Sequence, residues 1–496
     1  MTTRTRRPAR TILAFALAFL IAAGFGSAFN AEAAYAATYV PISGTGSTWS
    51  QNALDQWRKN VAANYGMTVN YSGTGSSAGR RDYIAGQVDF AISEIPFQTA
   101  PEDQSAPERP TTPFAYMPIV AGGTSFMYNL NIGGKRVTTL QLGGDSITKI
   151  FTGVITNWND KQIAAENPGL VLPDKAITPV VRSDGSGSTA QFTLWMSKQH
   201  SALWNSYCAA NGKTPPCGLT SQYPTPKNGK AQSGSLGVAG YVSQGYGEGA
   251  ITYVEYSYAL KSGFPVAKVR NAAGSYVEPT GVAVAVALQK AVINTTVSSP
   301  DYLTQNLDGV YNSADPVAYP LSSYSYMIVP TATTANFTTQ KGLSLSTFAN
   351  YMLCTGQKQA ESLGYSPLPE NLVAAGLEQV ARIPGALPAA SKCTGPLTPP
   401  PTAASGASAG GTAAGAGSGD AAAAGGDGAL YDANGALISG GASGGAVSSP
   451  FTLADSGFGS QQIVMLFAGI LVVAAVALPP VFSRRLKRAG TKTPGQ

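Results

Sequence analysis

A loop of glycine and serine residues with one arginine joins a predicted strand to a predicted helix. Residues 176–181 (AITPVV) favour a strand, and the apolar residues of 189–200 have helical spacing. The loop between them, 182–188, is RSDGSGS. Because the first N–H groups of a helix lack intrahelical partners and lie at the positive end of its dipole, this junction favours an anion. Arg182 adds a rigid fork of donors that suits a tetrahedral oxyanion.

Two further loops of the same composition precede helical patterns near the N-terminus. The first is 44–49 (GTGSTW), before the pattern 50–65, and the second is 71–79 (YSGTGSSAG), before 80–86. One such loop fits an ordinary strand-to-helix turn with a capping serine equally well. Three of them together predict helix starts that converge on one anion.

The alternation of strand and helix patterns predicts an α/β fold with open sheets. In such sheets ligands bind outside the carboxyl ends of the strands, where the three loops are expected. Residues 115–130 (AYMPIVAGGTSFMYNL) favour two buried strands broken by Gly122 and Gly123. The chain has 496 residues, which allows a two-lobed body with appendages. It has no stripe of Lys and Arg with interleaved aromatics, so we expect no nucleic-acid binding.

Both ends of the chain predict targeting and membrane attachment. Residues 1–37 combine an arginine-rich start, the apolar run 11–23 and small residues, which is typical of a secretory signal peptide. Residues 396–459 are rich in Gly, Ala, Ser and Pro and predict a disordered, flexible linker. Residues 463–482 are long and apolar enough for one C-terminal transmembrane helix. The basic tail 483–496 then places the C-terminus in the cytoplasm and the body outside.

Four cysteines lie in the part of the chain that is expected to be exported. An even number in an exported chain favours disulfides. Three pairings are possible, and we expect the local one, which joins Cys208 to Cys217 and Cys354 to Cys393. We expect no metal site, because the chain has no Cys-x-x-Cys sequence and its one histidine, His200, lies near the end of a predicted helix.

Six sequence motifs follow one another in an order that resembles a known family. They are GTGSTW (44–49), YSGTGSSAG (71–79), VDFAISEIPF (88–97), TNWNDKQIAAENPGL (156–170), VVRSDGSGST (180–189) and GAITYVEYSYAL (249–260). Together they resemble the phosphate-binding protein, the substrate-binding subunit, of bacterial phosphate ABC transporters. The resemblance covers about residues 38 to 390. It implies the type II periplasmic-binding-protein fold, with lobe I formed by 38–124 and 323–395 and lobe II by 125–322.

The resemblance also implies which residues bind the ligand. The implied set is Thr48, the backbone N–H of Trp49, Ser76, Glu94, Arg182, Ser186, Gly187 and Ser188, with Asp184 holding Arg182 in place. Glu94 corresponds to a carboxylate that accepts the phosphate proton. Three positions depart from the usual pattern: Trp49 replaces Phe, Ser188 replaces Thr, and Glu94 replaces Asp. The last of these bears on ligand identity and selectivity.

We therefore expect a monomeric, membrane-anchored receptor outside the cell that binds inorganic phosphate. It would deliver phosphate to ABC permease subunits, and it would use no cofactor and catalyse no reaction. One alternative is an oxyanion-binding surface receptor for signalling or assembly without transport. The other is a phosphatase, for which the sequence offers no metal constellation and no nucleophile–base pair other than a serine with His200.

Overall fold

The computed structural model describes residues 39–387 and Cys393. The predicted signal peptide, linker, transmembrane helix and basic tail (1–37, 396–459, 463–482 and 483–496) lie outside these residues. None of the helices in the described part is long and apolar enough to cross a bilayer.

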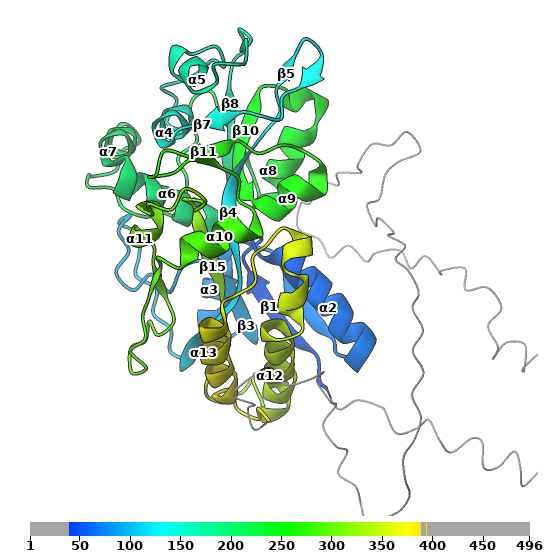
Figure 1. Ribbon diagram of the computed structural model, residues 1–496. Coiled ribbons are helices and arrows are strands. Elements are labelled where there is room, and N and C mark those ends of the chain that lie inside the picture. Colours follow the sequence, from blue (N-terminus) through cyan, green and yellow to red (C-terminus); the bar gives the residue numbers. More distant parts are fainter. Residues whose placement is uncertain (1–38, 388–392, 394–496) are drawn as a thin grey trace, which may run out of the picture. The chain divides into compact units, whose positions relative to one another are not determined.

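One eight-stranded sheet runs through both lobes (Figure 1). Its strand order is β2-β1-β3-β15-β4-β10-β8-β9. Its strands are β1 Ile42–Gly46, β2 Val69–Ser72, β3 Phe90–Ser93, β4 Phe114–Tyr128, β8 Thr178–Arg182, β9 Lys230–Gln232, β10 Ala250–Glu255 and β15 Ser322–Pro330. Strands β1, β2 and β3 are parallel in one lobe, and β8, β9 and β10 are parallel in the other. Each parallel group therefore presents its carboxyl ends, and the loops that follow them, at one edge.

The long strand β4 connects the two halves of the sheet. It pairs with β15 as far as Gly123 and with β10 from Thr124 onward, antiparallel in both cases. The predicted break at Gly122 and Gly123 is therefore wrong, because the strand continues through both. A Cβ at Gly122 would lie 2.8 Å from the Trp49 ring, and one at Gly123 would lie 2.6 Å from Pro279. The two glycines thus allow close packing rather than a turn.

The helices cover the sheet in two groups. The first lobe carries α2 Gln51–Tyr65, α3 Ser76–Ile84, α12 Thr339–Leu353 and α13 Glu370–Ala381. The second carries α4 Gly144–Phe151, α5 Lys161–Glu166, α6 Gly187–Gln199, α7 Ser201–Ala210, α8 Gly234–Ser243, α9 Tyr256–Ser262, α10 Gly281–Leu288 and α11 Asp308–Tyr311. Short strands form small sheets outside the main one: β5 Asn131–Ile132, β6 Lys135–Arg136, β7 Gln141–Leu142, β11 Lys268–Arg270, β12 Tyr276–Val277, β13 Val292–Ile293 and β14 Gln305–Asn306. The 3₁₀ turns are η2 Gly245–Gly247, η3 Gly356–Gln359 and η4 Glu361–Leu363.

Each lobe has its own hydrophobic core. In the first, Trp57, Phe90 and Phe348 are fully buried. In the second, Phe192 contacts Tyr253 within a cluster of aromatic rings, and a smaller cluster lies under α8. Two separate cores joined by a few strands allow the lobes to move as units.

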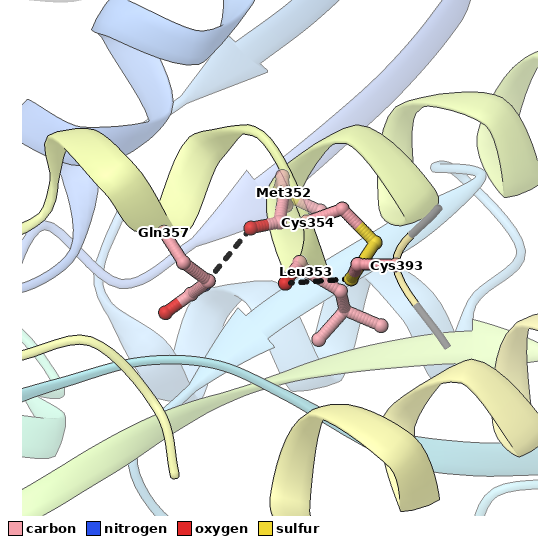
Figure 2. Close-up of a disulfide and its surroundings, with 5 residues drawn as sticks. All are labelled: Met352, Leu353, Cys354, Gln357 and Cys393. Carbon is pink, nitrogen blue, oxygen red and sulfur yellow. Dashed lines mark hydrogen bonds between the residues drawn. A yellow bond between two sulfur atoms is a disulfide. The ribbon is translucent and has the colours of Figure 1, made fainter. Parts of the chain in front are cut away.

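One of the two predicted disulfides is present. Figure 2 shows Cys354, at the end of α12, bonded to Cys393. Beside the bridge, the side-chain amide of Gln357 donates to the carbonyl of Met352 (2.8 Å). The bridge ties the end of α12 to Cys393, which lies just before the predicted linker (396–459).

The predicted bridge between Cys208 and Cys217 is not formed, and both are free thiols in the structure. Burial raises the pKa of the Cys208 thiol, and a hydrogen bond with Cys217 raises it further. A short separation in sequence does not by itself give two cysteines the Cα spacing and side-chain directions that a disulfide needs.

Candidate functional site

Loops from the two lobes meet at the carboxyl ends of their strands. Ser76 begins α3 and Gly187 begins α6, and the Gly187 N–H donates to the Ser76 hydroxyl (3.0 Å). The Ser77 N–H donates to the Gly185 carbonyl (3.1 Å). The loops 71–79 and 182–188 therefore come together as predicted, and the lobes are closed on each other in this structure.

Glu94 is fully buried between the lobes, just beyond the end of β3. The Ser76 hydroxyl donates to its Oε2 (2.8 Å), and the Ser325 hydroxyl donates to its Oε1 (2.6 Å). A Cβ on Gly187 would lie 1.8 Å from Oε2. The carboxylate thus points at the first residue of α6, and only glycine fits at position 187.

Arg182 is held by Asp184 from the same loop. Its Nε donates to Oδ1 of Asp184 (2.7 Å), and its Nη2 donates to Oδ2. Burial alone would raise the pKa of Asp184, but the hydrogen bonds and charge of Arg182 hold it below its ordinary value. Arg182 itself is only 3% exposed, so its orientation is fixed in a dry environment. Its remaining nitrogen, Nη1, points to the hydroxyl of Ser235 (3.4 Å).

The two residues expected from the first loop have different positions. The Thr48 hydroxyl lies 2.8 Å from the Ser235 hydroxyl, across the junction of the lobes. The Trp49 N–H donates to the Ser47 hydroxyl (2.9 Å), so the backbone donor expected to bind ligand already has a partner here. The Trp49 ring packs edge-on against Tyr365.

The three residues at the start of α6 differ in how their polar groups are used. Ser186 is the N-cap, and its hydroxyl accepts from the Thr189 N–H (3.2 Å). The Gly187 N–H donates to the Ser76 hydroxyl. The Ser188 hydroxyl is buried and has no hydrogen-bond partner among the described residues. An unpaired buried hydroxyl costs about 1–3 kcal/mol, a cost that a ligand oxygen would remove.

Sequence reasoning missed three residues that contact this cluster. They are Ser235, at the start of α8, Ser325, on β15, and Gln191, whose side-chain amide donates to the Glu94 carbonyl (2.7 Å). Ser325 and Gln191 carry no local signal, because their contacts depend on how distant segments pack. A local signal did exist for Ser235. Residues 230–235 (KAQSGS) contain a short strand followed by a Gly/Ser helix start, which is the pattern of the three other loops.

His200 does not join the cluster. It follows the last residue of α6, at the opposite end of that helix from Gly187, and packs against Trp195. Burial lowers its pKa. Within residues 39–387, no group of three His, Cys, Asp or Glu side chains is arranged to hold a metal ion.

Comparisons with known proteins place the chain in a family. Residues 31–355 match the family model for a PBP superfamily domain. The phosphate-binding protein PstS of Xylella fastidiosa (strain Temecula1) is 33% identical over 335 residues, which cover 67% of this chain and 83% of that protein. This chain belongs to the PstS phosphate-binding protein family. PstS 2 of Mycobacterium tuberculosis is 30% identical over 345 residues, 66% of this chain and 84% of that protein.

Solved structures agree with the fold. PfluDING, a high-affinity periplasmic phosphate-binding protein bound with phosphate, matches with a TM-score of 0.51 at 20% identity, over 68% of this chain and 92% of that one. The phosphate-binding protein from Stenotrophomonas maltophilia matches with a TM-score of 0.50 at 17% identity, over 68% and 92%. The chain therefore has the two-lobed α/β periplasmic-binding-protein fold. PstS proteins are binding proteins, so the phosphatase alternative has no support from the family.

Proposed function

We propose that this PstS-family protein binds inorganic phosphate between its two lobes and delivers it to an ABC permease. The observation that carries the proposal is the meeting of Ser76, Glu94 and Gly187 across the lobes, beside the buried Arg182. This arrangement combines hydroxyl and backbone donors at the start of α6 with a fixed guanidinium and one buried carboxylate. It suits an anion that carries both charge and a proton.

The roles of the proposed ligand set follow from what each group can donate or accept. The hydroxyls of Thr48 and Ser188 and the Arg182 guanidinium are donors for phosphate oxygens. Ser76, whose one proton is donated to Glu94 in this structure, would turn that proton to the ligand when phosphate binds. Glu94, when ionised, can only accept, and so takes the proton that phosphate retains near neutral pH. We include the Trp49 N–H and Ser186 as the resemblance implies. In this closed structure both are hydrogen-bonded within the chain.

The proposal extends to regions outside the described residues. We propose that 1–37 directs export, that 463–482 anchors the protein with its C-terminus in the cytoplasm, and that 396–459 is a flexible tether. A coil of that length spans about 40–45 Å root-mean-square. It would keep a monomeric body near a permease and raise its local concentration there. The lobe boundaries predicted from sequence, at 124/125 and 322/323, belong to the same proposal.

Isothermal titration of residues 38–395, which contain both cores, with phosphate, sulfate and arsenate tests the binding function. We expect Arg182→Ala to weaken phosphate binding by about 2–5 kcal/mol, because it removes the partner of a desolvated anion. Arg270→Ala, which removes an exposed arginine on β11, is the matched control and should bind as wild type. Circular dichroism would verify that both variants fold. Near-unchanged affinity in folded Arg182→Ala would show that the site is elsewhere.

A further inference from the structure

The start of α8 is a fourth Gly/Ser junction, and it lies in the same cluster as the other three. The helix begins at Gly234, after the short strand β9. Ser235, its second residue, is 0% exposed although it is a small polar residue near a helix start. Ser235 is not the residue that caps the helix. The N-cap is Ser233, an exposed residue whose side chain makes no capping hydrogen bond.

The first two residues of α8 hold the Arg182–Asp184 pair from both sides. The Gly234 N–H donates to Oδ1 of Asp184 (2.9 Å). The Ser235 hydroxyl accepts from Nη1 of Arg182 (3.4 Å), whose other donors are directed to Asp184. The four residues therefore form a closed ring of contacts. Because the ring engages the guanidinium at both ends, Arg182 has little freedom to turn.

Ser235 also contacts the other lobe through Thr48. Its N–H donates to the Thr48 hydroxyl oxygen (3.0 Å), and the two hydroxyl oxygens lie 2.8 Å apart. One bond between two hydroxyls uses only one of their two protons. Either hydroxyl can be the donor of that bond, and when Ser235 donates, the Thr48 proton is free for a ligand oxygen.

We propose that Ser235 is a positioning residue of the phosphate site, which orients the Thr48 hydroxyl and the Arg182 guanidinium when the lobes close. This inference rests on the proposed phosphate-binding function. It adds α8 to the three helix starts that form the site. Through it, the Ser235 side chain connects the Thr48 hydroxyl of lobe I to the Arg182 guanidinium of lobe II.

The test compares Ser235→Ala with Ser233→Ala in the full-length chain purified in detergent. Ser233 is the matched control, because it lies two residues away on the same turn. We expect the phosphate Kd of Ser235→Ala to rise about tenfold, the effect of a hydrogen bond of ordinary strength. Stopped-flow kinetics should place this change in the dissociation rate. Ser233→Ala should stay within about twofold of wild type.

A double-mutant cycle separates positioning from a general structural effect. If Ser235 acts through Thr48 as well as Arg182, its loss should matter less once Thr48 is already changed. We therefore expect Ser235→Ala to cost less than about threefold in a Thr48→Val background. Equal costs in both backgrounds, together with a lower melting temperature of the ligand-free variant, would overturn the proposal.

Failure of this inference and failure of the proposed function give different results. If wild type binds phosphate and folded Ser235→Ala binds equally well, only the role of Ser235 is refuted. If wild type binds no phosphate, the proposed function itself is refuted. Should Ser235→Ala not fold, Ser235→Cys keeps the size of the side chain and replaces the hydroxyl with a weak donor, and unchanged affinity of that variant would equally refute the role.

Discussion

At the scale of single residues, Glu94 is the residue that we propose sets the preference of the site between anions. Both of its carboxylate oxygens receive serine hydroxyls, from Ser76 on α3 and from Ser325 on β15. The residue is one methylene longer than the Asp usual at this position in the family that the motifs resemble. In the structure the longer side chain reaches the first turn of α6, where only a glycine leaves room for it. The carboxylate is therefore held against the start of α6, where we propose that the ligand binds.

We predict that Glu94→Gln reduces the preference for phosphate over sulfate. An ionised carboxylate accepts the proton of phosphate but faces an unprotonated sulfate oxygen without a hydrogen between them. The amide of Gln can turn its NH₂ toward either anion, so sulfate affinity should rise relative to phosphate by at least about tenfold. Titration with both anions measures the ratio. The exposed Glu361→Gln is the control. An unchanged ratio in Glu94→Gln would remove this residue from selectivity.

A second prediction concerns Asp184 and the pH dependence of stability. Its pKa is held below its ordinary value by Arg182 in spite of burial. A depressed folded pKa gives stability that is present above the unfolded value, about 3.9, and is lost as pH falls through the folded pKa. Asp184→Asn should therefore lower the free energy of unfolding at neutral pH and flatten its decline below about pH 4. Urea unfolding between pH 2 and 7 checks this, with the exposed Asp301→Asn as control. A variant with the wild-type acid slope would contradict it.

At the scale of elements, the strand–loop–helix units could be predicted because their signals are local. The segments 44–49, 71–79 and 182–188 each contain the turn from a strand to a helix, as predicted, although α3 begins at Ser76, four residues before the predicted start. The continuity of β4 could not be predicted, because β15 and β10 hold the strand straight through two glycines from far away in the sequence. The contacts of Ser325 depend on the same long-range pairing. The residue pattern of a loop can be read from a few neighbouring residues. The burial of a side chain and the closure of the lobes depend on segments that are distant in the sequence.

A loop from lobe I also reaches across to lobe II, away from the ligand site. We call residues 101–105 the strap. The Leu219 N–H donates to the Glu102 carboxylate (2.8 Å), and the Thr220 hydroxyl donates to Asp103 (2.7 Å). The side chain of Gln104 donates to the Thr214 carbonyl (3.0 Å). These contacts join the two lobes, so they should stabilise the closed form specifically.

We predict that Thr220→Val speeds phosphate release about three- to tenfold while leaving the association rate nearly unchanged. The substitution keeps the shape of the side chain but removes the hydrogen bond to the Asp103 carboxylate, which is worth about 1.5–3 kcal/mol when well shielded and less at this partly exposed place. It also removes the acceptor of the Gln222 N–H, a contact within lobe II that is present in the open and the closed form. Stopped-flow measurement of both rates tests it. Thr111→Val, an exposed position in the same connecting loop outside the strap, is the control. Equal release rates in wild type and Thr220→Val would show that the strap does not contribute to closure.

At the scale of the whole molecule, binding and attachment are assigned to separate parts of the chain. The proposed ligand residues lie between Thr48 and Ser188, with Ser235 and Ser325 beside them. Both cores lie between Ile42 and Ile383. The proposed anchor begins eighty residues after the last core residue, beyond the tether. Both cores and the proposed site are built from described residues, so we expect binding not to depend on attachment.

We predict that deletion of residues 460–496 releases the exported protein from the membrane with its phosphate affinity unchanged. A span of about 20 apolar residues is held in a bilayer by its own transfer free energy, so its loss removes the attachment. Fractionation of cells that express the full and the truncated chain measures location, and titration of the released protein measures affinity. Deletion of 489–496 alone, which leaves the span and the adjacent basic residues in place, is the control and should stay in the membrane fraction. A truncated chain that remained membrane-bound would reveal a second attachment, and one that was released but bound phosphate weakly would show that the tail takes part in binding.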